Sequence, residues 1–299
     1  MQYINTLKEG TPVSEHYLCK FKQQLKNRSG KPYYSLKLQD KTGIIEAKVW
    51  DINNRIDNFE VYDYIKIEGN VIVYQEEYQI NVQSIRKSME GEIDPTDYIP
   101  STPKNIEILL AQLNELVGSV KNVYIRSLLE LFFTDDHFIK QFKEHSAAKS
   151  IHHSYLGGLL EHSITVAKIG ENLCNYYMEA NKELVIAGCL LHDIGKLYEL
   201  SQFPENDYTD AGNMLGHITI GVEMLSQRIS QIPNFPKELA MLLKHIIISH
   251  HGEYEYGSPK RPKTIEAMIV HCADNTDARV KMFEELLHAD QSRGNYIGY

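Results

Sequence analysis

The chain has 299 residues, of which 42% are hydrophobic and 24% are charged, and its formal net charge at pH 7 is −9. This length suffices for two domains with cores of their own, and the composition is that of an ordinary soluble globular protein. No run reaches the roughly 18 apolar residues that a transmembrane helix needs, and the N-terminus lacks the apolar region of a signal peptide. We therefore expect a cytoplasmic protein that makes no contact with a membrane.

The charge is unevenly distributed along the chain. Residues 1–87 contain 13 lysines and arginines against 11 acidic residues, a balance of +2, so the remainder, with 18 against 29, carries −11. Residues 20–41 contain seven basic residues and one acidic residue, Asp40. Such a basic stripe on an acidic protein is a candidate contact for nucleic acid. A charged run is also common on surfaces that only face solvent, so this feature alone does not decide between the two.

From about residue 13 to residue 87, apolar and polar residues alternate with a period of two, which predicts β-strands. Five or six short antiparallel strands within about 75 residues must curl into a small barrel or sandwich. The long first strand and the basic turn at residues 27–31 fit an OB-fold best. The apolar members of the alternation are Tyr17, Cys19, Phe21, Tyr34, Leu36, Leu38, Ile45, Ala47, Val49, Ile65, Ile67, Val71, Val73, Tyr78, Ile80 and Val82.

The second and third strands of such barrels commonly bind oligonucleotides on their outer face. Four residues stand opposite the core alternation there, namely Tyr33, Lys37, Lys48 and Trp50. Aromatic rings that stack on bases, interleaved with lysines that neutralise phosphates, are typical of proteins that bind single strands. The alternative is that Tyr33 and Trp50 only cover the end of the barrel.

Residues 88–104 contain Pro95, Pro100 and Pro103 with few apolar residues, which predicts a linker. From residue 105 onward the apolar residues recur every three or four positions, which predicts helices up to residue 299. The expected fold is therefore multidomain: a small all-β OB-fold barrel over residues 1–87, followed by an all-α helical bundle over residues 105–299.

In the helical part, histidines and aspartates occur at or beside the ends of apolar runs. A buried histidine without a partner is costly, whereas imidazole and carboxylate together are a common ligand set for transition metals. The candidates are 23 to 33 residues apart, so they must converge from separate helices of one bundle. They are His162, His192, Asp193, His217, His250, His251 and Asp274, with Lys196 close by.

His192 and Asp193 are adjacent, and adjacent side chains point apart on a regular helix. Both can reach a metal only near a helix end, which the following Ile194-Gly195 supplies. A carboxylate such as Asp193 has two oxygens and can bridge two cations. Two cations roughly 4 Å apart activate a water molecule and neutralise a phosphoryl oxygen together.

The order His162, His192-Asp193 and Asp274 resembles the H…HD…D signature of the HD-domain phosphohydrolases. In this family the four residues hold one metal, so the resemblance implies the same first site here. It also implies that the ammonium of Lys196, one turn after Asp193, contacts the scissile phosphate.

The sequence HDIGK, with His217 and the pair His250-His251, is similar to the two-metal branch that includes the HD-GYP cyclic-dinucleotide phosphodiesterases, although no GYP sequence follows. The resemblance implies that these three histidines hold a second metal, with Asp193 as the bridge. A member with three metals would carry Glu at position 158, which is Gly here, so we expect two.

The N-terminal OB-fold and the sequence HHSYLGGLLEHS resemble the YhaM-type 3′→5′ exoribonucleases of Gram-positive bacteria over nearly the whole chain. This resemblance implies a metal-dependent phosphodiesterase that shortens single-stranded RNA, with single-stranded DNA as a second substrate, to nucleoside 5′-monophosphates. The expected cofactors are two divalent cations, Mn²⁺ first, with Fe²⁺ or Co²⁺ as alternatives.

Two other functions stay open at this stage. One is an HD-domain phosphodiesterase that acts on a small nucleotide or cyclic dinucleotide, and the other is a non-catalytic protein that binds single-stranded nucleic acid. The intact ligand set argues against the second. Metal identity, preference for RNA over DNA, processivity and oligomeric state, a homo-oligomer included, also stay open. So do the roles of His152 and His153, whereas His16, His137, His145, His271 and His288 are expected to be ordinary residues.

Overall fold

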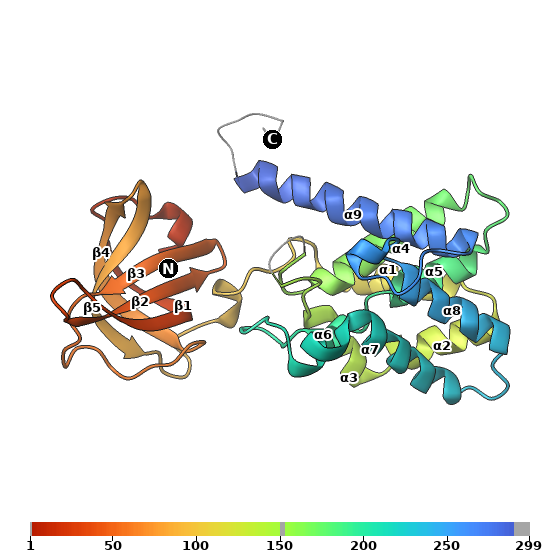
Figure 1. The fold of residues 1–299 in the computed structure, drawn as a ribbon, viewed down its shortest axis with the longest axis horizontal. Coiled ribbons are helices and arrows are strands. Elements are labelled where there is room, and N and C mark those ends of the chain that lie inside the picture. The colour runs from red at the N-terminus through yellow and green to blue at the C-terminus, as the bar shows by residue number, and fades with distance from the viewer. Residues whose placement is uncertain (1, 150–152, 290–299) are drawn as a thin grey trace. The chain divides into compact units, whose positions relative to one another are not determined.

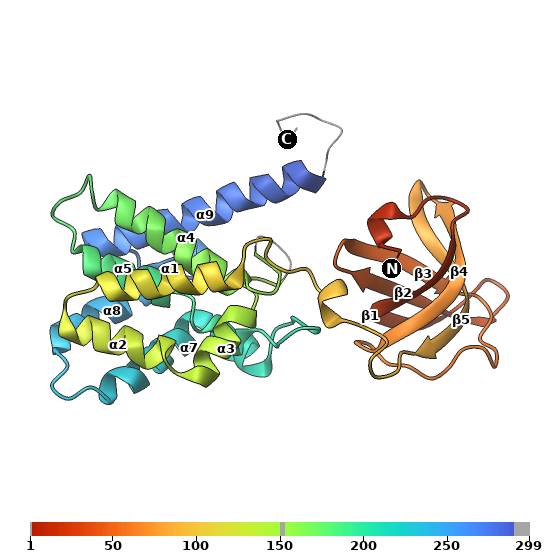
Figure 2. The same ribbon diagram turned by 180° about the vertical axis from the view of Figure 1, so that it is seen from behind.

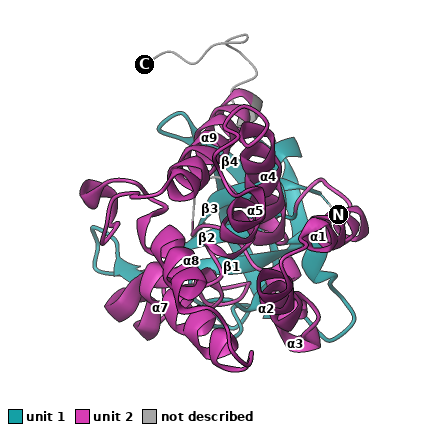
Figure 3. Ribbon diagram, turned by 90° about the vertical axis from the view of Figure 1, so that its right-hand side faces the viewer, with its two compact units in different colours: residues 1–101 teal, residues 102–299 magenta. Residues whose placement is uncertain are grey.

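The computed structural model describes residues 2–149 and 153–289. The chain divides into two compact units, residues 1–101 and residues 102–299 (Figure 3). The first unit is built from β-strands and the second from helices, as the change in sequence period predicts (Figure 1).

The first unit is a closed five-stranded barrel with the strand order β1-β2-β3-β5-β4. β3 and β5 pair in parallel, and the other neighbouring strands pair antiparallel. The predicted OB-fold barrel is confirmed. The strands are β1 (Pro12–Lys26), β2 (Pro32–Asp40), β3 (Gly43–Val49), β4 (Tyr64–Tyr74) and β5 (Glu77–Lys87), preceded by the 3-10 turn η1 (Ile4–Thr6).

The barrel core consists of alternate residues of its strands. On β2 and β3, Leu36, Leu38, Ile45, Ala47 and Val49 are all buried, as predicted. The residues between them therefore lie on the outer face of the barrel.

The prediction that Phe21 continues the buried series of β1 is wrong, because its side chain is 41% exposed. A β-bulge shifts the register between Cys19 and Phe21, so that Phe21 pairs with the exposed Lys37. Opposed residues of an antiparallel pair lie on the same face, so the extra residue turns Phe21 outward. Val73 and Tyr78, an opposed pair near the β4–β5 hairpin, are also exposed rather than buried.

Much of the segment predicted as a linker, residues 88–104, packs on the barrel. It contains the 3-10 turn η2 (Pro95–Asp97). The Lys41 ammonium lies 2.6 Å from an Asp97 carboxylate oxygen, and the Gln39 side chain donates a 2.9 Å hydrogen bond to the carbonyl of the buried Tyr98. Only the last three residues of the segment belong to the helical unit.

The second unit is a helical bundle in which the long α9 packs against α4 and α5 (Figure 2). Among the helices of residues 2–149 and 153–289, none combines the length and apolar character that crossing a membrane requires. The helices are α1 (Ile106–Ser119), α2 (Val123–Phe133), α3 (Asp136–Glu144), α4 (Gly158–Leu173), α5 (Lys182–Leu191), α6 (Lys196–Glu199), α7 (Asp210–Ser230), α8 (Lys237–Ser249), η3 (Tyr254–Tyr256) and α9 (Ile265–Ala289).

Side chains cap several helices of the bundle at their N-termini. Asn105, Asn122, Asp135 and Asn181 each accept hydrogen bonds from backbone N–H groups of the first turn of α1, α2, α3 and α5. Such caps satisfy N–H groups that have no partner within the helix. The caps fix the residue at which each helix starts. Because a helix is rigid, they also help to fix the position of the residues at its C-terminal end.

The chain turns sharply between α5 and α6, over residues 192–195. A Cβ atom at Gly195 would lie 2.0 Å from the carbonyl oxygen of His217 and 2.7 Å from the backbone nitrogen of Gly221. This turn therefore touches the backbone of α7 directly, and only glycine allows the contact.

Gly195→Ala should push the turn and α7 apart, because the atoms in the way are backbone and cannot rotate aside. We expect the free energy of unfolding to fall by about 1–3 kcal/mol, a typical cost of overpacking, in a urea titration followed by circular dichroism. Gly118→Ala on α1 is the control, since nothing lies within 4 Å of its Cβ position. Because alanine favours a helix by up to about 1 kcal/mol over glycine, the control should be neutral or stabilising. Equal stability of the two variants would contradict the prediction.

Candidate metal centre

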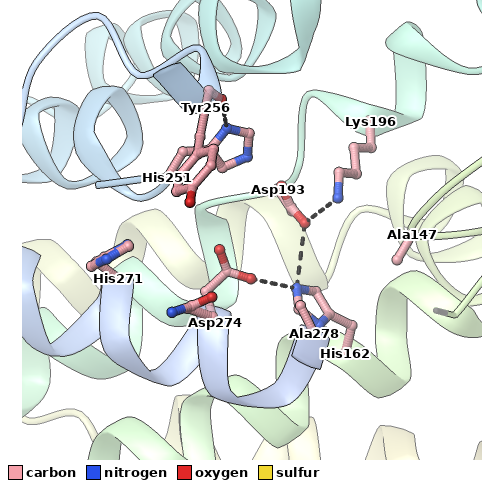
Figure 4. A pocket seen from close by; sticks show the side chains of 10 residues that line it. Ala147, His162, Asp193, Lys196, His251, Tyr256, His271, Asp274 and Ala278 are labelled. Carbon is pink, nitrogen blue, oxygen red and sulfur yellow. Dashed lines mark hydrogen bonds and ion pairs between the residues drawn. The ribbon is translucent and has the colours of Figure 1, made fainter. Parts of the chain in front are cut away.

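The first group of predicted ligands meets where α4, the turn after α5 and α9 converge. The Nε2 atom of His162 lies 3.2 Å from Nε2 of His192, 3.4 Å from Oδ2 of Asp193 and 3.2 Å from Oδ1 of Asp274. His192 Nε2 lies 3.3 Å from the same Asp193 oxygen. Figure 4 shows Asp193, Asp274 and His162 facing one another. Two imidazoles and two carboxylates therefore share one small volume.

The second group meets on the other side of Asp193. The Nε2 atoms of His217 and His250 each lie 3.6 Å from Oδ1 of Asp193. One ring nitrogen from each of His217, His250 and His251 falls within 4.8 Å of the others. His217 follows Gly216, whose φ of 72° breaks the helical course of α7. His250 caps the C-terminus of α8.

The donor atoms of the second group fit a cation. Oδ1 of Asp193, Nε2 of His217 and Nε2 of His250 are buried, and none of them has a hydrogen-bond partner among residues 2–149 and 153–289. Leaving a buried polar atom unpaired costs about 1–3 kcal/mol, so three such atoms around one point need a common partner. Two imidazole nitrogens and a carboxylate oxygen suit a divalent transition metal.

Each of the five histidines has its Nδ1 atom fixed by a second contact, which leaves Nε2 to face the centre. Nδ1 of His162 donates to Asp277 at 2.7 Å, and Nδ1 of His217 donates to Glu199 at 2.9 Å. Three other Nδ1 atoms donate to backbone carbonyls at 2.7 Å, those of His192, His250 and His251. Such contacts fix the tautomer and orientation of histidines that bind metals.

The pKa of His192 in the first group and the pKa values of His250 and His251 in the second group shift in opposite directions. Burial opposes a charge on His192, but the carboxylates of Asp193 and Asp274 outweigh it and raise its pKa to about 9. In the second group burial dominates and lowers the pKa of His250, and it lowers that of His251 to about 4 with the help of His250. His250 and His251 thus offer neutral imidazoles, whereas His162 and His192, whose pKa values are raised, must release protons when a cation binds.

Sequence reasoning missed the residues that orient these ligands. Asp277 receives hydrogen bonds from His162 and also from His153, at 3.0 Å. The other ring nitrogen of His153 bonds the Tyr155 hydroxyl at 2.9 Å, and that hydroxyl lies 3.0 Å from Glu161. Asp277 follows Asp274 by one helical turn, the only signal in the sequence that could have identified it.

His153, His162 and Asp277 form a further group of three that could hold a metal by distance alone. Their facing atoms already bond one another, so this group differs from the one around His217. Position 158 offers no further ligand either, because a Cβ there would lie 2.0 Å from the carbonyl oxygen of His153. His152 lies outside the described residues.

The histidines expected to be ordinary mostly are. Both ring nitrogens of the buried His145 lie within hydrogen-bond distance of carbonyl oxygens, and His16 bonds the hydroxyl of Ser88. His137 is exposed. His271 differs, because it lines a pocket that four of the candidate metal ligands also line. The side chain of His288 is outside the described part of the chain.

That pocket has a volume of about 330 Å³. Figure 4 shows Asp193 between Lys196 and Ala147 on one side and Tyr256 and His271 on the other. The ammonium of Lys196 lies 2.7 Å from Oδ2 of Asp193, and 14% of the side chain is exposed. An ammonium has three donors, so two are left to face a ligand.

Of the predicted nucleic-acid contacts, Tyr33, Lys37 and Lys48 lie on β2 and β3, and Trp50 directly follows β3. The rings of Tyr33 and Trp50 stack with their centroids 4.6 Å apart, and 43% of Trp50 is exposed. Lys37 is exposed as well. Lys48 instead contacts Glu46 at 3.1 Å and Ser35 at 2.7 Å, and only 16% of its side chain is exposed.

Comparisons with known proteins agree with this architecture. Residues 159–279 match the HD domain, and residues 20–87 match the OB-fold nucleic acid binding domain. The 3′-5′ exoribonuclease YhaM of Geobacillus sp. (strain WCH70) is 34% identical over 261 residues, which cover 87% of this chain and 80% of the relative. The chain belongs to the YhaM exoribonuclease family. The predicted class, a metal-dependent hydrolase, is thereby confirmed.

Two solved structures resemble one part of the chain each. The HD domain of the Listeria monocytogenes phosphodiesterase PgpH, in complex with cyclic-di-AMP, is 23% identical with a TM-score of 0.30, covering 46% of this chain and 81% of that one. The second OB-fold domain of replication protein A from Methanococcus maripaludis is 21% identical with a TM-score of 0.25, covering 31% and 100%.

Asp193→Ala should abolish binding of both cations, because Asp193 contributes one oxygen to each group. We expect elemental analysis of the purified variant to show almost no divalent metal after reconstitution with Mn²⁺, while the helical signal in circular dichroism is kept. Asp210→Ala, at the start of α7, is the control and should load like the wild type. Full loading of Asp193→Ala would contradict a shared site.

Two variants should weaken one group at a time. Asp277→Ala removes the acceptor that orients His162, and Glu199→Ala removes the one that orients His217. Loss of such a partner typically weakens metal binding about 10- to 100-fold. Isothermal titration with Mn²⁺ should therefore show one weakened and one unchanged site in each variant. Asp277→Asn and Glu199→Gln keep an acceptor and should lose less, and simultaneous loss of both sites in each Ala variant would argue against two separate groups.

Proposed function

We propose that this protein hydrolyses single-stranded RNA from the 3′ end to nucleoside 5′-monophosphates with two divalent cations, Mn²⁺ being the best candidate. Single-stranded DNA is proposed as a second, poorer substrate. The observation that carries the proposal is the buried carboxylate of Asp193, one oxygen of which faces each group of histidines. Family membership and the OB-fold support the choice of RNA.

The cations would be held by the seven residues already described, with Asp193 between them. Bound there, they would activate water and neutralise negative charge on a phosphoryl oxygen. The chain itself supplies a positioned positive charge, because Lys196 is anchored by Asp193 and lines the pocket. Its remaining donors would bind the oxygens of the scissile phosphate and stabilise the charge that develops on them. Cleavage of the P–O3′ bond then releases a 5′-monophosphate.

The barrel would retain the RNA whose end is being cut. The exposed ring of Trp50, backed by Tyr33, offers a surface on which a base of any identity can stack. Lys37 would neutralise a phosphate on the same face. Lys48 contributes only if it leaves Glu46, so stacking carries more of the contact than charge does.

Attack at a free 3′ end is the sharpest test of this function. A pocket of about 330 Å³ holds little more than one nucleotide, so a free terminus should enter more readily than the middle of a strand. With Mn²⁺, an RNA labelled at its 5′ end should shorten stepwise into a ladder on a gel, and a stable 3′ hairpin should stop it. A bulky 3′ block should inhibit far more than a 5′ block.

Circular RNA and a cyclic dinucleotide serve as comparison substrates in the same assay. Early internal fragments, or cleavage of circular RNA at a similar rate, would identify an endonuclease. Faster turnover of the cyclic dinucleotide than of the RNA would identify a phosphodiesterase for small nucleotides. Either result would overturn the proposed function.

Trp50→Ala should weaken the binding of single-stranded RNA by about 1–3 kcal/mol, the usual contribution of one stacked base. The measurement is fluorescence anisotropy with the full chain in chelator, so that no substrate is consumed. Tyr176→Ala is the matched control, since Tyr176 is an aromatic residue of the helical unit that is 78% exposed. Unchanged affinity in a folded Trp50→Ala protein would show that the ring only packs on Tyr33.

A further inference from the structure

His271 is a pocket residue with no role in the proposed mechanism so far. It lies on α9 three residues before Asp274, and both side chains line the pocket (Figure 4). Residues three apart on a helix are neighbours, with Cβ atoms roughly 5–6 Å apart. His271 is therefore next to the metal ligands without being one of them.

Two contacts hold the ring of His271 in one orientation. Its Nδ1 atom donates to the carbonyl oxygen of His250 at 2.7 Å. Gly252, whose φ is +81°, lies against the ring so closely that a Cβ there would be 2.2 Å from Cε1 of His271. A glycine at this point thus serves two needs, the left-handed backbone and the space for the imidazole.

The contact with His250 also fixes which ring nitrogen carries the proton. A carbonyl only accepts, so the proton of the neutral ring is on Nδ1 and Nε2 keeps its lone pair. Within the described residues Nε2 has no hydrogen-bond partner, and it is not among the buried unpaired atoms. In the neutral ring Nε2 is thus a hydrogen-bond acceptor of fixed orientation, on a side chain that lines the pocket.

An acceptor at this place selects among the groups of a bound nucleotide. Phosphate oxygens are acceptors themselves and cannot pair with it. Amino groups of bases are donors, but they differ from base to base and project away from the backbone. The 2′-hydroxyl is a donor present on every ribonucleotide, and the ribose adjoins the phosphate that would be cut.

We propose that Nε2 of His271 accepts a hydrogen bond from the 2′-hydroxyl of a nucleotide that flanks the scissile phosphate. His271 is then the residue by which this site favours RNA over DNA. The inference rests on the proposed exoribonuclease function and adds to it the origin of sugar specificity.

The test compares substrates within one enzyme preparation. Three oligonucleotides of equal sequence are used: all-ribose, with a single 2′-deoxy sugar at the terminal nucleotide, and with one at the penultimate nucleotide. In the wild type, one of the two single substitutions should lower kcat/KM about tenfold, which corresponds to roughly 1.4 kcal/mol and is typical of one hydrogen bond. The ratio of ribose to deoxy rates does not depend on how much of a preparation is folded.

Two variants separate the two nitrogens of His271. Asn places an amide donor near the position of Nδ1, so His271→Asn can keep the bond to the His250 carbonyl while removing the acceptor. Gln places an amide oxygen near Nε2, so His271→Gln can keep the acceptor. We expect His271→Asn to cut the all-ribose substrate about tenfold more slowly and to lose the ribose preference, whereas His271→Gln keeps part of it.

The outcomes separate this inference from the function on which it rests. If the wild type does not shorten the all-ribose RNA, the proposed function fails and the inference fails with it. If the wild type shortens RNA but His271→Asn slows all three substrates equally, the proposed function stands and the inference is wrong. His271 would then act on the reacting water or on the leaving oxygen. A wild type that shows no ribose preference at either position would also overturn the inference.

Discussion

The arrangement of the helical unit depends on one buried carboxylate, that of Asp193. Its side chain is 2% exposed, and each of its oxygens faces a different group of histidines. A buried charge is costly unless charged or hydrogen-bonding groups surround it. Lys196 and His192 supply that compensation and hold the pKa of Asp193 well below its usual range, even though burial acts to raise it. On the side of the second group, the described residues supply no hydrogen-bond partner for Oδ1 of Asp193 or for the Nε2 atoms of His217 and His250, and this set of atoms suits a cation.

Several features of the backbone bring Asp193 and the histidines around it together. The end of α5 at Leu191 allows His192 and Asp193 to point to one centre, and Gly195 lets the following turn touch α7. The break at Gly216 then presents His217 toward Asp193. Each of these features is local and depends on a glycine or on the end of a helix. They explain why a site assembled from five segments does not need an unusual fold.

The sequence predicts which side chains converge because residues that can bind a metal have a chemical signature. Histidines and aspartates at the ends of apolar runs are rare enough to be noticed, and all seven side chains do converge. Asp277 and Glu199 escape notice because an acidic residue on a helix is ordinary until its neighbours in space are known. His271 escapes for the same reason, since its environment depends on Gly252 and on a carbonyl of another helix.

The barrel shows a similar limit. The period of two predicts the strands and their buried face. It cannot predict a β-bulge, because a bulge is a shift in the pairing of two strands, and neither strand's own sequence shows it. For this reason the alternation predicts the wrong face for Phe21. In the segment 88–104 prolines predict irregular backbone correctly, yet they do not show that Tyr98 is buried on the barrel.

The distribution of charge explains why the proposed function assigns binding and cleavage to different kinds of contact. Residues 88–299 carry a formal charge of −11, and such a surface repels a polyanion. The positive charge that would bind the scissile phosphate is therefore concentrated at Lys196 and at the cations that the buried side chains would hold. On the barrel, Lys31, Lys41 and Lys48 are each paired with a carboxylate, at 2.7, 2.6 and 3.1 Å. These pairs leave the three lysines less able to bind phosphates, which is why the proposed function assigns retention of the strand to stacking on Trp50, a contact that does not depend on base identity.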